Sequence, residues 1–543
     1  MRIPNVPCLL LSFVLAILPA NLAAQSGDLG RIDFPTSASA EAQKHFLRGA
    51  LLLHSFEYED AAEEFRAAQK LEPSFAMAYW GEAMTHNHPL WMERERQSAV
   101  EILNRLAPTP EARRAKAPTE REKGYLDAVE ALYGEGEKAD LDRAYAESMR
   151  RLYEKYPEDL DAASFYALAL LGTTEGKRDI PTYMRAAGIA EEVFAKNPLH
   201  PGAVHYLIHC YDDPVRAPLG MRVARVYSKI APAAGHPLHM PSHIFFASGM
   251  WEEAAASNAA AWKASLDRAV RKKLGPDDHN YHALLWLEYA NLQLGRYADA
   301  RRALALMEKD AAESKSTRAR SHLAMIRAAY LVETRQWKGD AAGLLVASDD
   351  LPQKGLAFFV EGARALDRGD RTAAEKALAD LQAAAKANAE GPHSATGMSY
   401  MMHRSSGTDA VLARELEAKL LLAKGETEHA LTLAREAASA EDSLNFEFGP
   451  PVVVKPAHEL LGEMLLEARR SADARKEFEV ALSKTPRRAL ALLGLARSAA
   501  QSGDASAARQ TYAELSRIWS RADSDLPERR EIAAMDAVTA AGR

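Results

Sequence analysis

The stretch GALLLHSFEYEDAAEEFRAAQKLEP, from Gly49 to Pro73, decides the fold class. Small residues alternate with large ones along it, in the order Gly49, Leu52, Tyr58, Ala61, Phe65, Ala68 and Pro73. Small side chains let two helices approach closely, and large side chains fill the space between helices. This spacing predicts a helix-turn-helix unit, and such a unit buries its apolar face only by stacking on copies of itself.

Copies of the unit recur farther along the chain. The same spacing is found at Gly462, Ala474, Phe478, Ala481 and Pro486, and one 34-residue period later at Ala496, Ala508 and Tyr512. The intervening segments are amphipathic and rich in strong helix formers, and none alternates as a strand does. The pattern resembles the tetratricopeptide repeat (TPR), and we expect an all-α, right-handed superhelical solenoid of TPR-like units from about Ser37 to Ile532.

The first 24 residues have the layout of a secretory signal peptide. Arg2 precedes an apolar run from Cys8 to Leu18, and the small residues Ala23 and Ala24 follow. We expect cleavage after Ala24 and export to the periplasm or the extracellular space. The run is shorter than the roughly 20 residues that cross a bilayer, and no later stretch is continuously apolar over that length. We therefore expect no membrane insertion.

The predicted organisation is a signal peptide (1–24), an N-terminal TPR-like array (25–271) and a C-terminal array that continues the solenoid (272–543). The boundary rests on the polar insertion from Lys272 to Asp278, which lengthens the spacing between Gly249 and Gly295 to 46 residues. The net charge of −7 becomes −8 without Arg2. A mildly acidic chain with scattered basic residues predicts no nucleic-acid partner. Cys210 is then the remaining cysteine, so no internal disulfide can form.

Two histidine pairs recur at the repeat period. His205 and His209 are four residues apart, and so are His239 and His243, which lie 34 residues later. Residues i and i+4 share a helical face, and adjacent helices pack roughly 8–10 Å apart. Imidazoles from both helices can then reach one ion with bonds of roughly 2.0–2.1 Å. The spacing predicts a transition-metal site, zinc first, with copper or iron as alternatives.

Further polar residues are lower-ranked metal candidates. They are Asp212, His236, His279, His282, His86 and His88. Asp212 should extend the stripe of His205 and His209, because i+7 returns to the same face. Pro237 and Pro241 bracket His239, and if the helix begins only at Pro241, His239 and His243 do not share a face.

Evidence for catalysis is weaker than evidence for metal binding. Asp212 and Asp278 are the candidate catalytic residues, as ligands or as a general base. Tyr206 and Met240 occupy the place where the zinc-peptidase motif His-Glu-x-x-His has its glutamate, so that class is disfavoured. Two structural readings stay open: the imidazoles could cap helix ends, or their spacing could preserve the ancestry of duplicated repeats.

Three longer stretches are similar to one group of TPR proteins in bacteria and eukaryotes whose activity is poorly defined. They are HPGAVHYLIHCYDDP (200–214), APAAGHPLHMPSHIFFASGMWEEA (231–254) and FGPPVVVKPAHELLGEMLLE (448–467). The resemblance implies the fold and a concave groove lined by the first helix of each unit, and it implies no substrate. Two function classes follow: an exported solenoid that binds a transition metal or a peptide or protein ligand in its groove, and a metal-dependent hydrolase or oxidoreductase using the same cluster.

Overall fold

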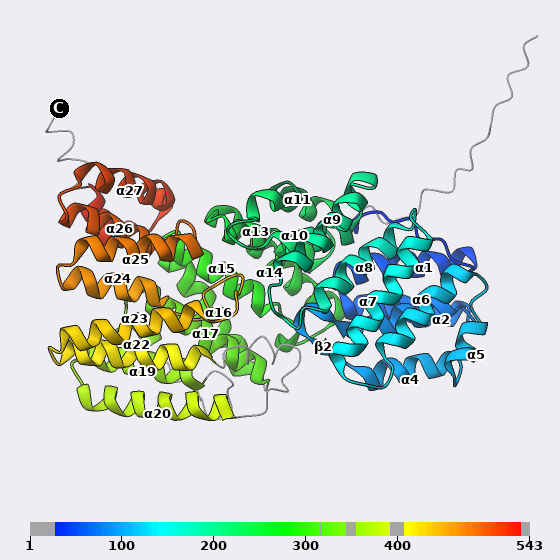
Figure 1. The fold of residues 1–543 in the computed structure, drawn as a ribbon, viewed down its shortest axis with the longest axis horizontal. Coiled ribbons are helices and arrows are strands. Elements are labelled where there is room, and N and C mark those ends of the chain that lie inside the picture. The colour runs from blue at the N-terminus through cyan, green and yellow to red at the C-terminus, as the bar shows by residue number, and fades with distance from the viewer. Residues whose placement is uncertain (1–27, 315, 344–353, 391–406, 534–543) are drawn as a thin grey trace, which may run out of the picture.

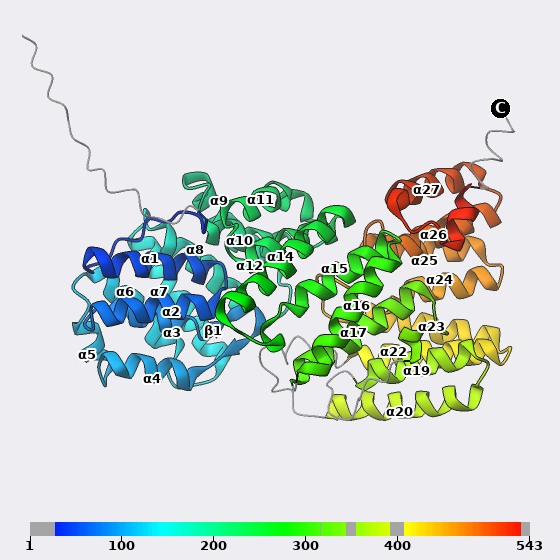
Figure 2. The same cartoon turned by 180° about the vertical axis from the view of Figure 1, so that it is seen from behind.

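The fold is described from a computed structural model, for residues 28–314, 316–343, 354–390 and 407–533. The predicted signal peptide lies outside these residues. Within them the chain is an all-α solenoid of helix pairs stacked in sequence order, as the repeat spacing predicts (Figure 1). Helices α10 to α17 lie between the two ends of the chain in both views (Figures 1 and 2). None of the helices in these ranges is long and apolar enough to cross a bilayer.

The N-terminal part consists of helix pairs and one short hairpin. Its elements are α1 (Ala40–His54), α2 (Tyr58–Leu71), α3 (Ala76–Met84), β1 (Asn87–His88), η1 (Pro89–Trp91), β2 (Glu93–Arg94), α4 (Arg96–Leu106), α5 (Pro110–Ala115), α6 (Glu120–Leu132), α7 (Lys138–Lys155), α8 (Leu160–Gly172) and α9 (Ile180–Lys196).

The central part carries the histidine pairs. Its elements are α10 (Pro201–Tyr211), α11 (Ala217–Ile230), α12 (Gly235–His239), α13 (Pro241–Ala247), α14 (Trp251–Lys272), η2 (Pro276–Asp278), α15 (Tyr281–Gln293), α16 (Tyr297–Glu313), α17 (Thr317–Thr334) and α18 (Asp340–Gly343).

The C-terminal part returns to regular pairs. Its elements are α19 (Lys354–Asp367), α20 (Arg371–Glu390), α22 (Thr408–Ala423), α23 (Thr427–Asp442), α24 (Ala457–Glu467), α25 (Ser471–Lys484), α26 (Ala489–Gln501), α27 (Ala505–Ile518) and η4 (Trp519–Arg521).

The same packing device stacks the repeats near both ends of the chain. Phe65 of α2 is fully buried against Gly49 of α1 and Gly81 of α3, where an added Cβ would lie 2.8 and 2.3 Å from the ring. Phe478 of α25 lies against Gly462 and Gly494 in the same way, at 2.9 and 2.2 Å. Because glycine has no Cβ, each phenylalanine ring has room to pack against the neighbouring helices. The alternation of small and large residues in the sequence therefore matches the packing between helices.

The sequence pattern did not predict the short antiparallel ladder between β1 and β2. Asn87 pairs with Arg94 and His88 with Glu93. Helix α3 ends at Met84 and the chain turns into the hairpin, so His88 lies on β1 and not on a helix.

Candidate metal centre

Helix α10 positions the first histidine pair. Pro201 occupies its first turn, where the missing N–H costs nothing, and the side chain of His200 caps it by accepting the Ala203 N–H at 3.2 Å. His205 and His209 lie one turn apart on this helix and are both buried. Their Nε2 atoms are 3.2 Å apart.

The imidazoles of His239 and His243, the second pair, lie close together even though the helix that carries them is interrupted. Helix α12 ends at His239 and α13 begins at Pro241. Met240 between them keeps right-handed helical angles (φ −54°, ψ −36°), so the i, i+4 geometry survives the junction. The Nε2 atoms of His239 and His243 are 3.2 Å apart, and both residues are buried.

Each pair recruits a third imidazole from another element. His236 Nε2 lies 3.1 Å from His205 Nε2. The nitrogens of His205, His209 and His236 form one group within 4.8 Å, and those of His239, His243 and His282 of α15 form a second such group. The four histidines that the sequence predicted around one ion therefore lie in two separate groups of three, which we call triads and which also include His236 and His282. We call the six residues together the histidine centre.

The two triads are neighbours. The rings of His209 and His243 have centroids 5.4 Å apart, and those of His236 and His239 are 6.0 Å apart. The Asp212 carboxylate lies between the triads, with Oδ2 3.1 Å from His243 Nδ1 and 3.7 Å from His209 Nδ1. His209, Asp212 and His243 thus form a third group of potential ligands.

Asp212 does not extend the stripe on α10, because the helix ends at Tyr211 and Asp212 caps it with non-helical angles. Arg178, in the turn before α9, contacts its other oxygen, with Nη1 2.6 Å from Oδ1. Burial disfavours the charged carboxylate, but Arg178 and the hydrogen bonds from His209 and His243 outweigh it and lower the pKa of Asp212 below its usual value. Asp212 is therefore an ionised partner of both triads.

Hydrogen bonds at Nδ1 fix the tautomers of three centre histidines. His205 Nδ1 lies 2.8 Å from the carbonyl oxygen of His54, which can only accept, so Nδ1 carries the proton. His239 Nδ1 donates to Asn258 Oδ1 at 2.6 Å, and Asn258 uses its own N–H to donate to the Ala254 carbonyl at 2.8 Å. His243 Nδ1 donates to Asp212. In the neutral ring each of these three residues then presents an Nε2 lone pair to the centre.

The centre favours neutral imidazole. Burial lowers the pKa of His205, His236 and His239 well below the ordinary value, and neighbouring imidazoles add to the effect. Burial likewise lowers the pKa of His282 to about 3. Neutral imidazole is the form that binds metal ions, and a hydrogen bond at the second ring nitrogen orients the ligand.

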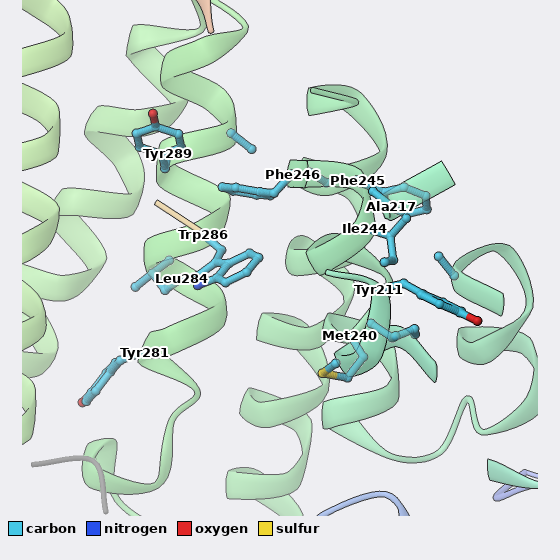
Figure 3. Packing of buried hydrophobic residues seen from close by; sticks show 14 of the residues in the cluster. Tyr211, Ala217, Met240, Ile244, Phe245, Phe246, Tyr281, Leu284, Trp286 and Tyr289 are labelled. Atoms are coloured by element: carbon cyan, nitrogen blue, oxygen red, sulfur yellow. The ribbon is translucent and has the colours of Figure 1, made fainter. Parts of the chain in front are cut away.

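Packing holds the two sides of the centre together. Trp286 of α15 points toward α13, where its ring centroid lies 4.5 Å from that of Phe246 (Figure 3). Its ring centroid also lies 4.6 Å from that of His243. Phe448, from the segment before α24, covers His243 at 4.7 Å. The next residue, Gly449, comes so close to Trp286 that an added Cβ would lie 2.3 Å from its ring.

The other histidines predicted from sequence lie outside the two triads. His86 pairs with Glu95 at 2.6 Å and His88 with Glu93 at 3.1 Å, both on the β1–β2 hairpin. His279 pairs with Asp310 at 2.6 Å, and Asp278 is exposed in η2. Each of these three imidazoles therefore has a carboxylate partner at Nδ1.

A further buried cluster, His54, Asp161 and His200, is also a potential ligand set. His54 Nε2 lies 3.0 Å from Asp161 Oδ1, and its Nδ1 lies 2.9 Å from the Tyr206 hydroxyl. His200 uses Nδ1 to cap α10, which leaves Nε2–H pointing at Asp161 and Ser164 at 3.5 and 3.4 Å. The contacts of both histidines go to one oxygen, Asp161 Oδ1, and Oδ2 is buried without a hydrogen-bond partner. The cluster supports α10 through the His200 cap.

Sequence reasoning missed three residues that shape the centre. Asn258 orients His239, Arg178 holds Asp212, and Phe448 covers His243. Asn258 lies 19 residues from His239 and Arg178 lies 34 residues from Asp212, so no local spacing links either residue to its partner. Phe448 opens one of the three stretches similar to other TPR proteins, which was the signal available for it.

No family model matches this chain, and no curated protein matches it either. Solved structures to which it is similar include the P58(IPK) TPR domain (13% identity, TM-score 0.24, covering 86% of this chain and 99% of that one). Human IFIT1 in a dimer with m7Gppp-AAAA has 13% identity and a TM-score of 0.34, covering 94% and 92%. Yeast Tom70 has 13% identity and a TM-score of 0.26, covering 93% and 96%. The fold assignment rests on the helix pairs of this chain.

Proposed function

We propose that this protein binds transition-metal ions, zinc first, at the histidine centre, with one ion in each triad. The observation that carries the proposal is the approach of His239 Nε2 to His243 Nε2 at 3.2 Å. Both Nδ1 atoms are donors, so two lone pairs face each other in a buried place. Two facing lone pairs repel, and a cation between them turns the repulsion into two ligand bonds.

The distances agree with this proposal. Zinc–nitrogen bonds of about 2.0–2.1 Å at tetrahedral angles put two ligand nitrogens about 3.3 Å apart. The nitrogen pairs His205–His209, His205–His236 and His239–His243 measure 3.2, 3.1 and 3.2 Å. An extra proton shared by two rings is the alternative to an ion, and burial opposes it by lowering the pKa of His205 and His239.

A metal-dependent enzyme is the second candidate function. Each triad offers three imidazoles, and three protein ligands are the number typical of catalytic zinc sites, whereas structural sites have four. Asp212 is the carboxylate nearest to both triads, and it also lines an open pocket. Asp278 is exposed, which weakens it as a catalytic candidate.

Metal analysis of matched variants tests the proposal. His236 and His282 are the half-buried members of their triads, so alanine at either position disturbs the fold least. Purified wild-type protein dialysed against zinc should hold two ions per chain by elemental analysis, and His236→Ala or His282→Ala should hold one. The double variant should hold none, with an unchanged far-ultraviolet circular dichroism spectrum. Wild-type protein that stays free of zinc, copper and iron would refute the proposal, and a peptide ligand in the groove would then be the leading reading.

A further inference from the structure

An open pocket of about 600 Å³ lies beside the histidine centre. One wall is the segment from Asp212 to Arg216, and α13 contributes His243 and Phe246. The opposite wall is the segment from Glu441 to Pro456, and the C-terminal end of α25 closes one side. This volume is typical of sites for small organic molecules, which are concave and mostly apolar.

Exposed apolar side chains gather in this pocket. Eight large apolar residues are exposed in the described part of the chain, and three of them, Val215, Phe446 and Val452, line the pocket. They come from both walls, so they face one shared space. A concentration of exposed apolar surface in a hollow marks a binding site more often than scattered single residues do.

The charged groups of the walls already have partners. Arg178 Nη1 lies 2.6 Å from Asp212, and Arg216 Nη1 lies 3.2 Å from Asp213. Lys484 pairs with Asp442 at the far side. An anionic ligand such as a phosphate would compete with these carboxylates for the cations, whereas a neutral ligand would leave all the pairs intact.

We propose that this pocket binds a neutral small molecule with an aromatic or aliphatic body, held between Val215 on one wall and Phe446 and Val452 on the other. The ligand lies against the edge of the histidine centre, because His243 of the centre and its partner Asp212 both line the pocket. Binding depends on the apolar walls and does not require the ion, so this site is separate from the proposed metal function.

A neutral fluorescent dye, N-phenyl-1-naphthylamine, tests the pocket. The wild-type chain should bind it saturably at one site per chain, in metal-free and in zinc-dialysed protein. Val215→Asp and Val452→Asp should each weaken binding about tenfold or more, because the ligand would bury a carboxylate without a partner. Val270→Asp is the matched control, since Val270 is 80% exposed, Val215 is 79% exposed, and Val270 lies on α14 outside the pocket.

Three outcomes would overturn the proposal: no saturable binding to the wild-type chain, equal weakening by Val270→Asp, or full binding by both pocket variants. Loss of dye binding only in variants whose thermal melting is also altered would count against the proposal too. Both valines are exposed, and their replacement should leave folding intact. Dye binding by a chain that binds no zinc would refute the metal function and keep the pocket. Zinc binding without dye binding would do the reverse.

Discussion

Two buried polar clusters of this protein differ in whether they contain their own cations. The histidine centre gathers six imidazoles around positions that suit a cation, and its one buried carboxylate is shared with Arg178. A second set, the arginine cluster, consists of Arg488, Glu459, Glu333 and Lys455 and lies between α17, α24 and α26. Arg488 Nε lies 2.7 Å from Glu459 and its Nη2 lies 2.6 Å from Glu333.

The presence or absence of internal cations distinguishes the two kinds of buried polar cluster in this solenoid. The arginine cluster supplies its own cations: Lys455 Nζ lies 2.6 Å from Glu459, and Arg488 also donates to the Tyr289 hydroxyl. The cluster joins α15 and α17 to α24 and α26, which are several helix pairs apart along the chain. The histidine centre has oriented lone pairs and supplies no cation to face them, so its geometry points to an ion from outside.

The largest expected effect removes the cation of the arginine cluster. Arg488→Met leaves Glu333 and Glu459 buried without their main partner, and breaking a buried pair in this way costs about 3–5 kcal/mol. Urea unfolding followed by circular dichroism measures it. Arg302→Met is the control, because Arg302 pairs with Asp299 on the surface and should change stability by about 0.5 kcal/mol or less. Equal losses in the two variants would show that the cluster is not the charge-balanced core described here.

A smaller effect per site should come from filling the histidine centre. Zinc at about 100 times its dissociation constant should stabilise the native state by about 2.7 kcal/mol for each ion bound. Hydrogen exchange should slow in α10, α12, α13 and α15, which carry the ligands, and should stay unchanged in α24 and α26 around Arg488. Slower exchange confined to α24 and α26 would contradict the assignment of the cation site.

The smallest effect is expected at a histidine outside the centre. His86 is bound to Glu95 on the hairpin, so His86→Ala should leave the zinc content unchanged and alter the free energy of unfolding by about 0.5 kcal/mol or less. Elemental analysis and urea unfolding measure the two quantities. Loss of an ion from this variant would show that the metal site includes the hairpin. It would contradict the distinction between the imidazoles that pair with carboxylates on the hairpin and the six imidazoles of the histidine centre.

The fold was predictable because its determinants are local and repeated. The spacing from Gly49 to Phe65 recurs from Gly462 to Phe478, and both phenylalanines pack against glycines as the size pattern requires. The hairpin after α3 was missed because two-residue strands leave no periodic signal.

The candidate site was predictable only within each helix. His205 with His209 and His239 with His243 follow from i, i+4 spacing, and Met240 preserved the second pair despite Pro241. The division into two triads did not follow, because His236 and His282 join through contacts between elements. Spacing reports neighbours on one helix, whereas the membership of each triad depends on the angle at which successive repeats stack.

The contact of Phe448 and Gly449 with His243 and Trp286 has a consequence for how the protein is made. All six imidazoles belong to residues 205–282, and Phe448, which covers His209 and His243, is synthesised about 160 residues later. At roughly 5–20 residues per second a ribosome needs on the order of 10–30 s for that interval. The imidazoles therefore exist for a time in a nascent chain that still lacks this cover, and the segment between α23 and α24 completes it.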